Sequence, residues 1–332
     1  MEQQTLPQLS DKELYSQWCE TQPDMPVFMQ PWWLDAVCAG KQWDVMLYTN
    51  SRTGAVLAAL PYQTSKRWRI RFVIMPKMTQ IAGIWFDKSL RNDDGTIWDK
   101  EIEKSVCEDF IKRIDELGLW YYYQQFPLYS SCVSYFQNSG FKVKKRVTYR
   151  IDDLADLDAV IDRFSKNKKR QLQKALSLHT ERSMTAEDFY RFHTECLTAQ
   201  KKKITYSREF LLVLDRKTSR LNQSRIISIH NADGEVCAAA YVVWDKQTLY
   251  YLIPCYSPKY KESGAGALLA LECIKLAREK GLQFDFEGSM IKGVANHYKQ
   301  FGSTPVTYFS IHKYYKRLFA LALFYNWLKQ KL

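Results

Sequence analysis

The apolar positions between residues 226 and 256 come in three short runs. The segment IISIHNADGEVCAAAYVVWDKQTLYYLIPCY breaks these runs at an Ala-Asp-Gly turn and at an Asp-Lys-Gln turn, so it predicts three antiparallel strands. From 261 to 281 the apolar residues instead recur on one face of a helix that ends at Gly281. LQFDFEG then predicts a strand, followed by a short helix and the strand TPVTYFSIH.

The first half of the chain repeats this order of elements. DVMLYTN, AVLAALPYQ and IRFVIMP predict the meander, and IEKSVCEDFIKRIDELG predicts the helix. LWYYYQQF, SCVSYFQNSG and KKRVTYRID predict the strand, the short helix and the last strand. Gly118 aligns with Gly281 at an offset of 163 residues (281 − 118), and Ile111 with Ile274 at the same offset. A repeat of this length indicates duplication, so we predict two tandem α/β (α+β) mixed-sheet domains, residues 1–150 and 151–332.

The two halves differ where a polar site can form. The strand of the second half carries Asp285 and Glu287, whereas its counterpart LWYYYQQF is aromatic. Polar side chains at the carboxyl end of a strand commonly surround a ligand. We therefore predict that Asp285, Glu287 and Ser289 line a cleft between the two copies. The alternative is a strand end that meets solvent.

The helix of the second half also opens on a glycine turn, Lys261-Glu-Ser-Gly264-Ala-Gly266, which the first half replaces with a long loop. Glycines at a helix start let backbone N–H groups approach a phosphate, and the helix dipole favours the anion. This predicts that the second half holds a phosphate-bearing donor. A purely structural glycine turn is the alternative.

Composition and cysteine usage narrow the class of protein. The chain has 332 residues, of which 46% are hydrophobic and 25% charged, which is typical of a two-domain globular protein. Its eight cysteines form no CxxC pair, so we expect reduced thiols, a cytoplasmic protein and no metal site. The first residues, MEQQTLPQLSDKELYSQW, lack the pattern of a secretory signal. The sequence contains no run of 18 apolar residues, so we expect no membrane span.

The formal net charge of +12 predicts an anionic partner. Basic residues cluster at 66–71, in SKNKKRQLQKA (165–175), at 201–203 and near the C-terminus. Such clusters attract the phosphates of nucleic acid, anionic lipid, nucleotide-sugar or coenzyme A. Lys168 and Arg170, within 165–175, are more typical of phosphate contacts than of catalysis. A solvated helix face is the alternative.

Several of these motifs together resemble one superfamily. The meander followed by Lys261-x-x-Gly-x-Gly at a helix start resembles the acyl-CoA-binding core of GNAT N-acyltransferases. The duplication, the basic helix and the ending DFEGS…YKQFG are similar to Fem-type aminoacyltransferases, which are built as two tandem GNAT folds. VFMQPWWLDAV and IMPKMTQIAGIWF resemble first-domain motifs of the same group. The resemblance covers roughly Val27 to His312.

The resemblance implies a co-substrate, an acceptor and site residues. The donor is acyl-CoA or aminoacyl-tRNA, held by the second domain, and the acceptor is an amine of a small molecule or cell-envelope precursor on the side of the first domain. Donor-binding residues on this basis are Ile253, Lys261, Gly264, Ala265 and Gly266. Substrate-binding residues are Thr79, Gln80, Gly83, Lys168, Arg170 and Ser289.

Acyl transfer to an amine needs a neutral amine, a polarised carbonyl and a proton for the leaving group. Asp285 or Glu287 can orient the amine or accept its proton, and Tyr298 or Lys299 can stabilise the oxyanion or protonate the leaving atom. The chain departs from the family in two ways. It lacks the long helical hairpin of staphylococcal-type Fem proteins, and its lysine lies one place nearer the final Phe-Gly than in Phe-Lys-x-x-Phe-Gly. The sequence thus leaves open whether Tyr298 or Lys299 faces the reacting carbonyl.

Two other functions are compatible with the sequence, and the C-terminal tail has two possible placements. The chain can be a non-catalytic protein with a degenerate GNAT fold that binds tRNA or another phosphate ligand, although no RNA-recognition motif occurs. It can also acylate a sugar or amino acid during capsule or lipid synthesis. The tail YYKRLFALALFYNWLKQKL predicts an amphipathic helix that either packs on the protein core or makes a peripheral contact with the inner membrane face.

Overall fold

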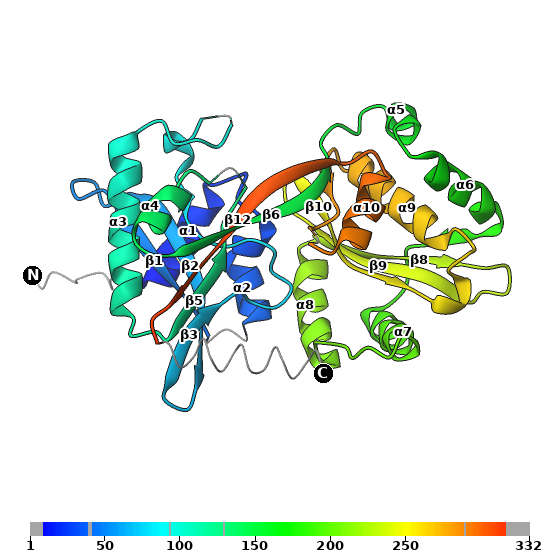
Figure 1. Cartoon of the computed structure of the whole chain (residues 1–332), viewed down its shortest axis with the longest axis horizontal. Coiled ribbons are helices and arrows are strands. Elements are labelled where there is room, and N and C mark those ends of the chain that lie inside the picture. Colours follow the sequence, from blue (N-terminus) through cyan, green and yellow to red (C-terminus); the bar gives the residue numbers. More distant parts are fainter. Residues whose placement is uncertain (1–8, 39–41, 93, 129, 289, 317–332) are drawn as a thin grey trace, which may run out of the picture. The chain divides into compact units, whose positions relative to one another are not determined.

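The chain folds into two units of mixed α/β structure, which a computed structural model describes for residues 9–38, 42–92, 94–128, 130–288 and 290–316 (Figure 1). One unit comprises residues 1–145 and 308–332, and the other comprises residues 146–307. Among the described residues, no helix combines the length and the apolar character needed to cross a bilayer. The predicted tail helix falls within 317–332, which lies outside the described residues.

The first unit contains a mostly antiparallel sheet with the strand order β1-β2-β3-β5-β12, in which only β3 and β5 are parallel. Its strands are β1 (Trp43–Thr49), β2 (Val56–Arg67), β3 (Ile70–Ile74), β4 (Trp85–Phe86), β5 (Tyr121–Gln125) and the end of β12 (Thr304–Tyr314). Its α-helices are α1 (Asp11–Glu20), α2 (Pro31–Val37), α3 (Lys100–Glu116) and α4 (Val133–Asn138), with 3-10 turns at Val27–Met29 and Lys88–Leu90.

Helix α3 shows how the sequence builds this unit. The Asp99 side chain caps its start by accepting hydrogen bonds from the N–H groups of Glu101 and Ile102. Residues at helical spacing form its buried face, and they pack into the core of the unit; they are Val106, Cys107, Phe110, Ile111 and Ile114. The helix ends before Gly118, which adopts a left-handed backbone.

The second unit contains a sheet with the order β6-β11-β10-β9-β8-β7, in which only β10 and β11 are parallel. Its strands are β6 (Lys142–Ile151), β7 (His179–Glu181), β8 (Ser224–His230), β9 (Val236–Trp244), β10 (Thr248–Tyr256) and β11 (Gln283–Asp285). Its α-helices are α5 (Leu157–Asp162), α6 (Lys166–Lys174), α7 (Ala186–Ala199), α8 (Arg208–Arg220), α9 (Ala265–Glu279) and α10 (Lys292–Lys299), with 3-10 turns at Ala175–Ser177 and Pro258–Tyr260.

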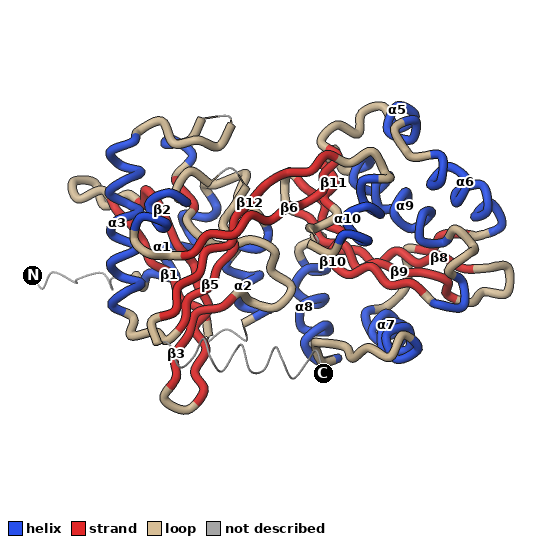
Figure 2. Tube along the Cα trace, viewed as in Figure 1, coloured by secondary structure: helices blue, strands red, loops and turns tan. Residues whose placement is uncertain are grey.

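Helices cover both faces of this sheet (Figure 2). The alternation along β9 explains the arrangement, because Ala240 packs into the core with α9 while Tyr241 points to the other face. There the Tyr241 hydroxyl lies 2.6 Å from the hydroxyl of Thr218 on α8, and its ring contacts Phe189 on α7. Helix α9 is therefore held against β8, β9 and β10 on one side only.

The order of elements predicted from the repeat is confirmed, as is the mixed α/β fold class. The pairing of the last strand of each repeat was not predicted. Strand β6 ends the first repeat but pairs with β11, through Ile151 opposite Phe284. Strand β12 ends the second repeat, yet its final residues pair with β5, through Tyr314 opposite Tyr121. Each repeat thus contributes its last strand to the sheet of the other.

Candidate active site

Strands β10 and β11 part at the end of β11. Their parallel register ends at Tyr250 opposite Asp285, while β10 continues to Tyr256. Beyond Asp285 the chain stays with β6, because the Phe286 N–H donates to the Tyr149 carbonyl at 2.9 Å. Within the described ranges, residues 251–256 of β10 therefore have no strand partner on this side. The splay point, meaning residues 251–256 and 285–288, lies within the second unit.

Asp285 anchors the turn at this splay point. Its side chain is buried, and its Oδ1 accepts hydrogen bonds from the Thr148 hydroxyl and from the Glu287 N–H, the latter at 2.7 Å. Burial raises the pKa of Asp285 to about 6, against the opposing effects of the Thr148 hydrogen bond and the Arg150 charge. The carboxyl group therefore holds the backbone in place while remaining largely ionised at neutral pH.

Glu287 has two features that are unfavourable for the free energy of folding. Its backbone lies in the left-handed region, with φ at +53°, which is unfavourable for a residue with a Cβ atom. Its Oε1 is buried without a hydrogen-bond partner in the described part of the chain. Burial and the nearby Asp285 charge raise the pKa of Glu287 well above its ordinary value. Backbone strain and an unpaired buried oxygen are typical of functional sites.

Gly288 explains why the turn is so tight. A Cβ atom at this position would lie 1.9 Å from the Val147 carbonyl oxygen of β6. Only glycine fits this approach, which presses the turn onto β6 and away from β10. Ser289, which the sequence analysis placed in the same site, lies outside the described residues.

Tyr298 packs against this turn. It lies on α10, is buried, and stacks on the Phe286 ring with centroids 4.7 Å apart and planes 23° apart. Burial, followed by the charges of Glu287 and Asp285, raises the pKa of Tyr298, so its hydroxyl is protonated at neutral pH. Lys299, by contrast, is exposed. Of the two residues that the sequence left open, Tyr298 is thus the one beside the carboxyl groups.

The two glycines of the turn at the start of α9 have different surroundings. Gly264 has a left-handed backbone (φ +83°), and a Cβ atom there would lie 2.0 Å from the Gln171 carbonyl oxygen of α6. Gly264 therefore has a structural reason to be glycine. A Cβ atom on Gly266 would lie 3.2 Å from two atoms of the Tyr256 ring. Ala265 already donates its N–H to the Ser263 hydroxyl at 3.2 Å.

The two remaining residues predicted to bind the donor, Ile253 and Lys261, differ in exposure to solvent. Ile253 is buried on β10, opposite Tyr241 of β9. Lys261 is exposed just before α9. Donor binding by these residues and by the glycine turn stays a prediction.

Lys168 is not a surface residue. Its side chain is only 2% exposed, although it lies on the very basic helix α6. Its Nζ donates to the Gln171 side chain at 3.0 Å and lies 3.1 Å from Nδ1 of His297 on α10. The same ammonium lies 4.7 Å from the centroid of the Phe301 ring. Arg170, on the same helix, is exposed and donates to the Asn167 side chain at 3.2 Å.

Burial shifts both Lys168 and His297 toward the neutral state, and their contact contributes to the shift of His297. Burial lowers the pKa of Lys168 to about 8. Burial and then the Lys168 charge lower the pKa of His297 to about 4. His297 is therefore neutral near pH 7 and accepts a hydrogen bond from Lys168. No local sequence pattern indicates this contact, because 129 residues separate the two positions (297 − 168).

The substrate residues predicted in the first half lie in the first unit. Thr79 is buried and accepts a hydrogen bond from Nε1 of Trp33 at 3.0 Å. Gly83 has φ at +120°, and a Cβ atom there would lie 2.6 Å from the Phe126 ring. Gln80 is half-buried. These contacts give each residue a structural setting, and their role in binding substrate stays a prediction.

A family model described as acetyltransferase (GNAT) domain matches residues 134–300. The match covers half of the chain, and it includes β6 together with the second unit up to the end of α10. The chain belongs to this family and is a GNAT acyltransferase. Among curated proteins, none matches the sequence.

Several solved structures share the fold over most of the chain. FemX has a TM-score of 0.66 at 12% identity, covering 91% of this chain and 96% of its own. The C-terminal domain of a putative lysylphosphatidylglycerol synthetase from Agrobacterium fabrum has a TM-score of 0.56 at 14% identity, covering 95% and 96%. A tandem GNAT protein from the clavulanic acid biosynthesis pathway has a TM-score of 0.51 at 12% identity, covering 91% and 93%. The predicted Fem-type tandem GNAT resemblance is confirmed at the level of fold.

Proposed function

We propose that the second unit binds a phosphate-bearing acyl donor at the splay point and transfers its acyl or aminoacyl group to an amine. The donor is acyl-CoA or aminoacyl-tRNA, and the acceptor belongs to a small molecule or a cell-envelope precursor. The observation that carries the proposal is the strained turn of Glu287, whose buried carboxyl oxygen has no partner among the described residues. Such a group gains a hydrogen bond when an amine enters the site.

The start of α9 supplies the donor end of this site. Helix N-termini attract phosphates, since their first N–H groups have no partner within the helix. Here the N–H of Ala265 is used by Ser263, which leaves the N–H of Gly266 as the nearest candidate. Lys261 and Arg170 are exposed and basic, so they can contact the same phosphates. This part of the proposal applies equally to coenzyme A and to tRNA.

The reaction forms a C–N bond to the acceptor and breaks the C–S bond of a thioester or the C–O bond of an aminoacyl ester. We assign the proton of the attacking amine to Glu287. A carboxylate of ordinary pKa is too weak a base for an ammonium group, and the raised pKa of Glu287 narrows that gap. Tyr298, whose hydroxyl is protonated, gives its proton to the leaving sulfur or oxygen. Asp285 positions Glu287 through the backbone hydrogen bond.

Acyl-CoA and charged tRNA both occur in the cytoplasm, so we propose a cytoplasmic site of action. An envelope precursor with an amine would be modified before export. A peripheral membrane contact through 317–332 belongs to the same proposal and would bring the enzyme to a lipid-linked acceptor. Membership of an acyltransferase family favours a catalytic role over that of a non-catalytic binding protein.

The test is a transfer assay with paired donors and acceptors. Acetyl-CoA, longer acyl-CoAs and charged tRNA are offered with amino acids, amino sugars and a peptidoglycan precursor peptide, and products are detected by mass spectrometry. Wild-type protein should give an amide with one donor class, and E287Q should lose most of that product. Binding of a donor without transfer to any amine, or equal transfer by E287Q, would contradict the proposal.

A further inference from the structure

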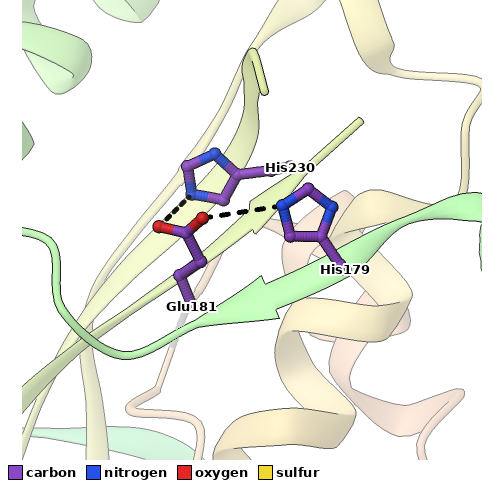
Figure 3. A group of neighbouring side chains, drawn as sticks. All are labelled: His179, Glu181 and His230. Carbon is purple, nitrogen blue, oxygen red and sulfur yellow. Dashed lines mark ion pairs between the residues drawn. The ribbon is translucent and has the colours of Figure 1, made fainter. Parts of the chain in front are cut away.

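Three metal-ligating side chains meet at the sheet edge of the second unit, away from the splay point in the strand order. Strands β7 and β8 are antiparallel, and their register places His179 opposite His230 and Glu181 opposite Ser228. Residues two apart on a strand share a face, so His179 and Glu181 lie on the face that also carries His230. Figure 3 shows the three side chains converging from the two strands.

The distances suit a bound ion. One carboxylate oxygen of Glu181 lies 3.5 Å from Nε2 of His179, and the other lies 3.5 Å from Nε2 of His230. One ligand atom from each of the three side chains lies within 4.8 Å of the other two. Ligands about 2.0–2.1 Å from a tetrahedral zinc ion are themselves about 3.3–3.4 Å apart. Small rotations of exposed side chains would complete this geometry.

The orientation of His230 provides a second, independent observation. Its Nδ1 lies 3.1 Å from the Gly234 carbonyl oxygen, which can only accept a hydrogen bond. Nδ1 is therefore the atom that donates to Gly234, which leaves Nε2, the nitrogen that faces Glu181, as the ligand atom for an ion. Metal-binding histidines usually donate their other ring N–H to a carbonyl or carboxylate in this manner. The Ser228 hydroxyl, 2.9 Å from the same Nε2, can rotate to accept from a metal-bound water.

Nearby basic charge does not neutralise Glu181. The adjacent Arg182 is engaged with Glu279, through two hydrogen bonds of 2.7 and 2.9 Å. Among the described residues, the ion-pair partners of Glu181 are therefore the two histidines alone.

We propose that His179, Glu181 and His230 bind a divalent transition-metal ion of the zinc class, with water in the remaining position. Two imidazoles and one carboxylate suit zinc, nickel or copper better than magnesium or calcium. The ion would join β7, a strand of only three residues at the sheet edge, to β8. The sequence predicted no metal site, because the register of β7 and β8, and no spacing along the chain, brings the two histidines together.

The test uses untagged full-length protein and zinc competition against a chromogenic chelator. We expect one bound zinc per chain, and affinity at least about tenfold lower for H179Q and for E181Q. Glu209, an exposed glutamate on α8, supplies the matched control E209Q, which should bind as wild type does. Zinc should also raise the Tm of the wild type, and EDTA should reverse this shift.

Two results would overturn the proposal. One is an affinity for zinc in both H179Q and E181Q equal to that of the wild type, which would show that zinc binds elsewhere on the chain. The other is no zinc bound by the wild type at concentrations that saturate the chelator. Circular dichroism spectra confirm that each variant is folded. Cobalt offers a further readout, since its visible absorption spectrum reports tetrahedral coordination and should be lost in the same two variants.

Discussion

The Asp285 carboxylate accepts the backbone N–H of Glu287 at 2.7 Å, and so holds Glu287 in a left-handed conformation. These two acidic residues, two positions apart, therefore have different surroundings. Asp285 is bound by the Thr148 hydroxyl on β6 and by the turn itself, and in the proposed function it positions Glu287. Glu287 has the carboxyl oxygen that remains available to a ligand.

Replacing Glu287 should separate stability from activity. E287G removes the cost of a left-handed non-glycine residue, about 1–2 kcal/mol, together with an unpaired buried carboxyl oxygen. We expect a higher midpoint of urea unfolding and a loss of turnover of about 100-fold or more. E287Q, which keeps the strain, should lose turnover without the gain in stability. A destabilised E287G would show that this carboxyl group serves the fold.

Asp285 should make stability depend on pH. Its pKa is raised by burial to about 6 from an unfolded value near 3.8, so folding disfavours the ionised form. The stabilising contribution is fully present below the unfolded pKa and is lost as pH rises through about 6. The loss is on the order of 3 kcal/mol.

Urea unfolding between pH 4 and 7 measures this contribution. D285N retains an oxygen that can accept both hydrogen bonds, and it should flatten the decline. D158N, which changes an exposed carboxylate on α5 that does not contribute to the Asp285 shift, should leave the slope unchanged. Equal slopes in wild type and D285N would mean that Asp285 titrates normally.

The glycines of the α9 turn should respond differently to alanine. G264A forces a left-handed alanine into the Gln171 carbonyl and should lower stability by about 2 kcal/mol or more. G266A meets only the edge of the Tyr256 ring and should fold nearly as wild type, but with weaker donor binding. Gly293, which has open space around it and no positive φ, supplies the control G293A. Calorimetric binding of acyl-CoA that is unchanged in G266A would exclude the turn from the donor site.

Tyr298 and Lys299 can be distinguished by two conservative changes. Y298F retains the stacking on Phe286 and removes only the hydroxyl, so kcat should fall with little change in Tm. The loss should shrink for donors with a better leaving group, which need less protonation. K299M, at an exposed position, should retain kcat. The reverse outcome, with K299M inactive and Y298F active, would assign the proton donor to the lysine.

Lys168 should control the titration of His297. The Lys168 charge helps to lower the pKa of His297 to about 4, so K168M should raise that pKa. The shift would be incomplete, because burial contributes more than the charge does. NMR titration of the histidine ring protons measures it directly, and R170M is a control on the exposed side of α6. An unchanged His297 pKa in K168M would show that the 3.1 Å contact does not persist in solution.

The sequence predicted the elements better than it predicted their partners. Periodicity and turn residues gave the helix around Ile111 and its repeat around Ile274, because local patterns carry that information. The pairing of β6 with β11 depends on contacts between residues far apart in sequence, such as Ile151 with Phe284, and no local pattern reports it. The same limit applies to His179, Glu181 and His230, which the register of β7 and β8 brings together.

For the candidate site, too, local sequence patterns predicted the residues but not their contacts. Carboxylates at a strand end pointed to Asp285 and Glu287, but composition could not tell which one is bonded and which is free. That distinction requires the Thr148 hydroxyl and the backbone of the turn. The basic run predicted Lys168 as a phosphate contact, and the fold buries its side chain against His297.

The central claim is that the acyl donor binds at the splay point of the second unit. Hydrogen–deuterium exchange of the wild-type protein, with and without acetyl-CoA, a longer acyl-CoA or charged tRNA, tests it most directly. We expect the donor that supports transfer to slow exchange in residues 251–256 of β10 and in the first turn of α9, because these backbone N–H groups would bind the donor. Protection confined to the first unit, or to parts of the second unit away from β10 and α9, would contradict it.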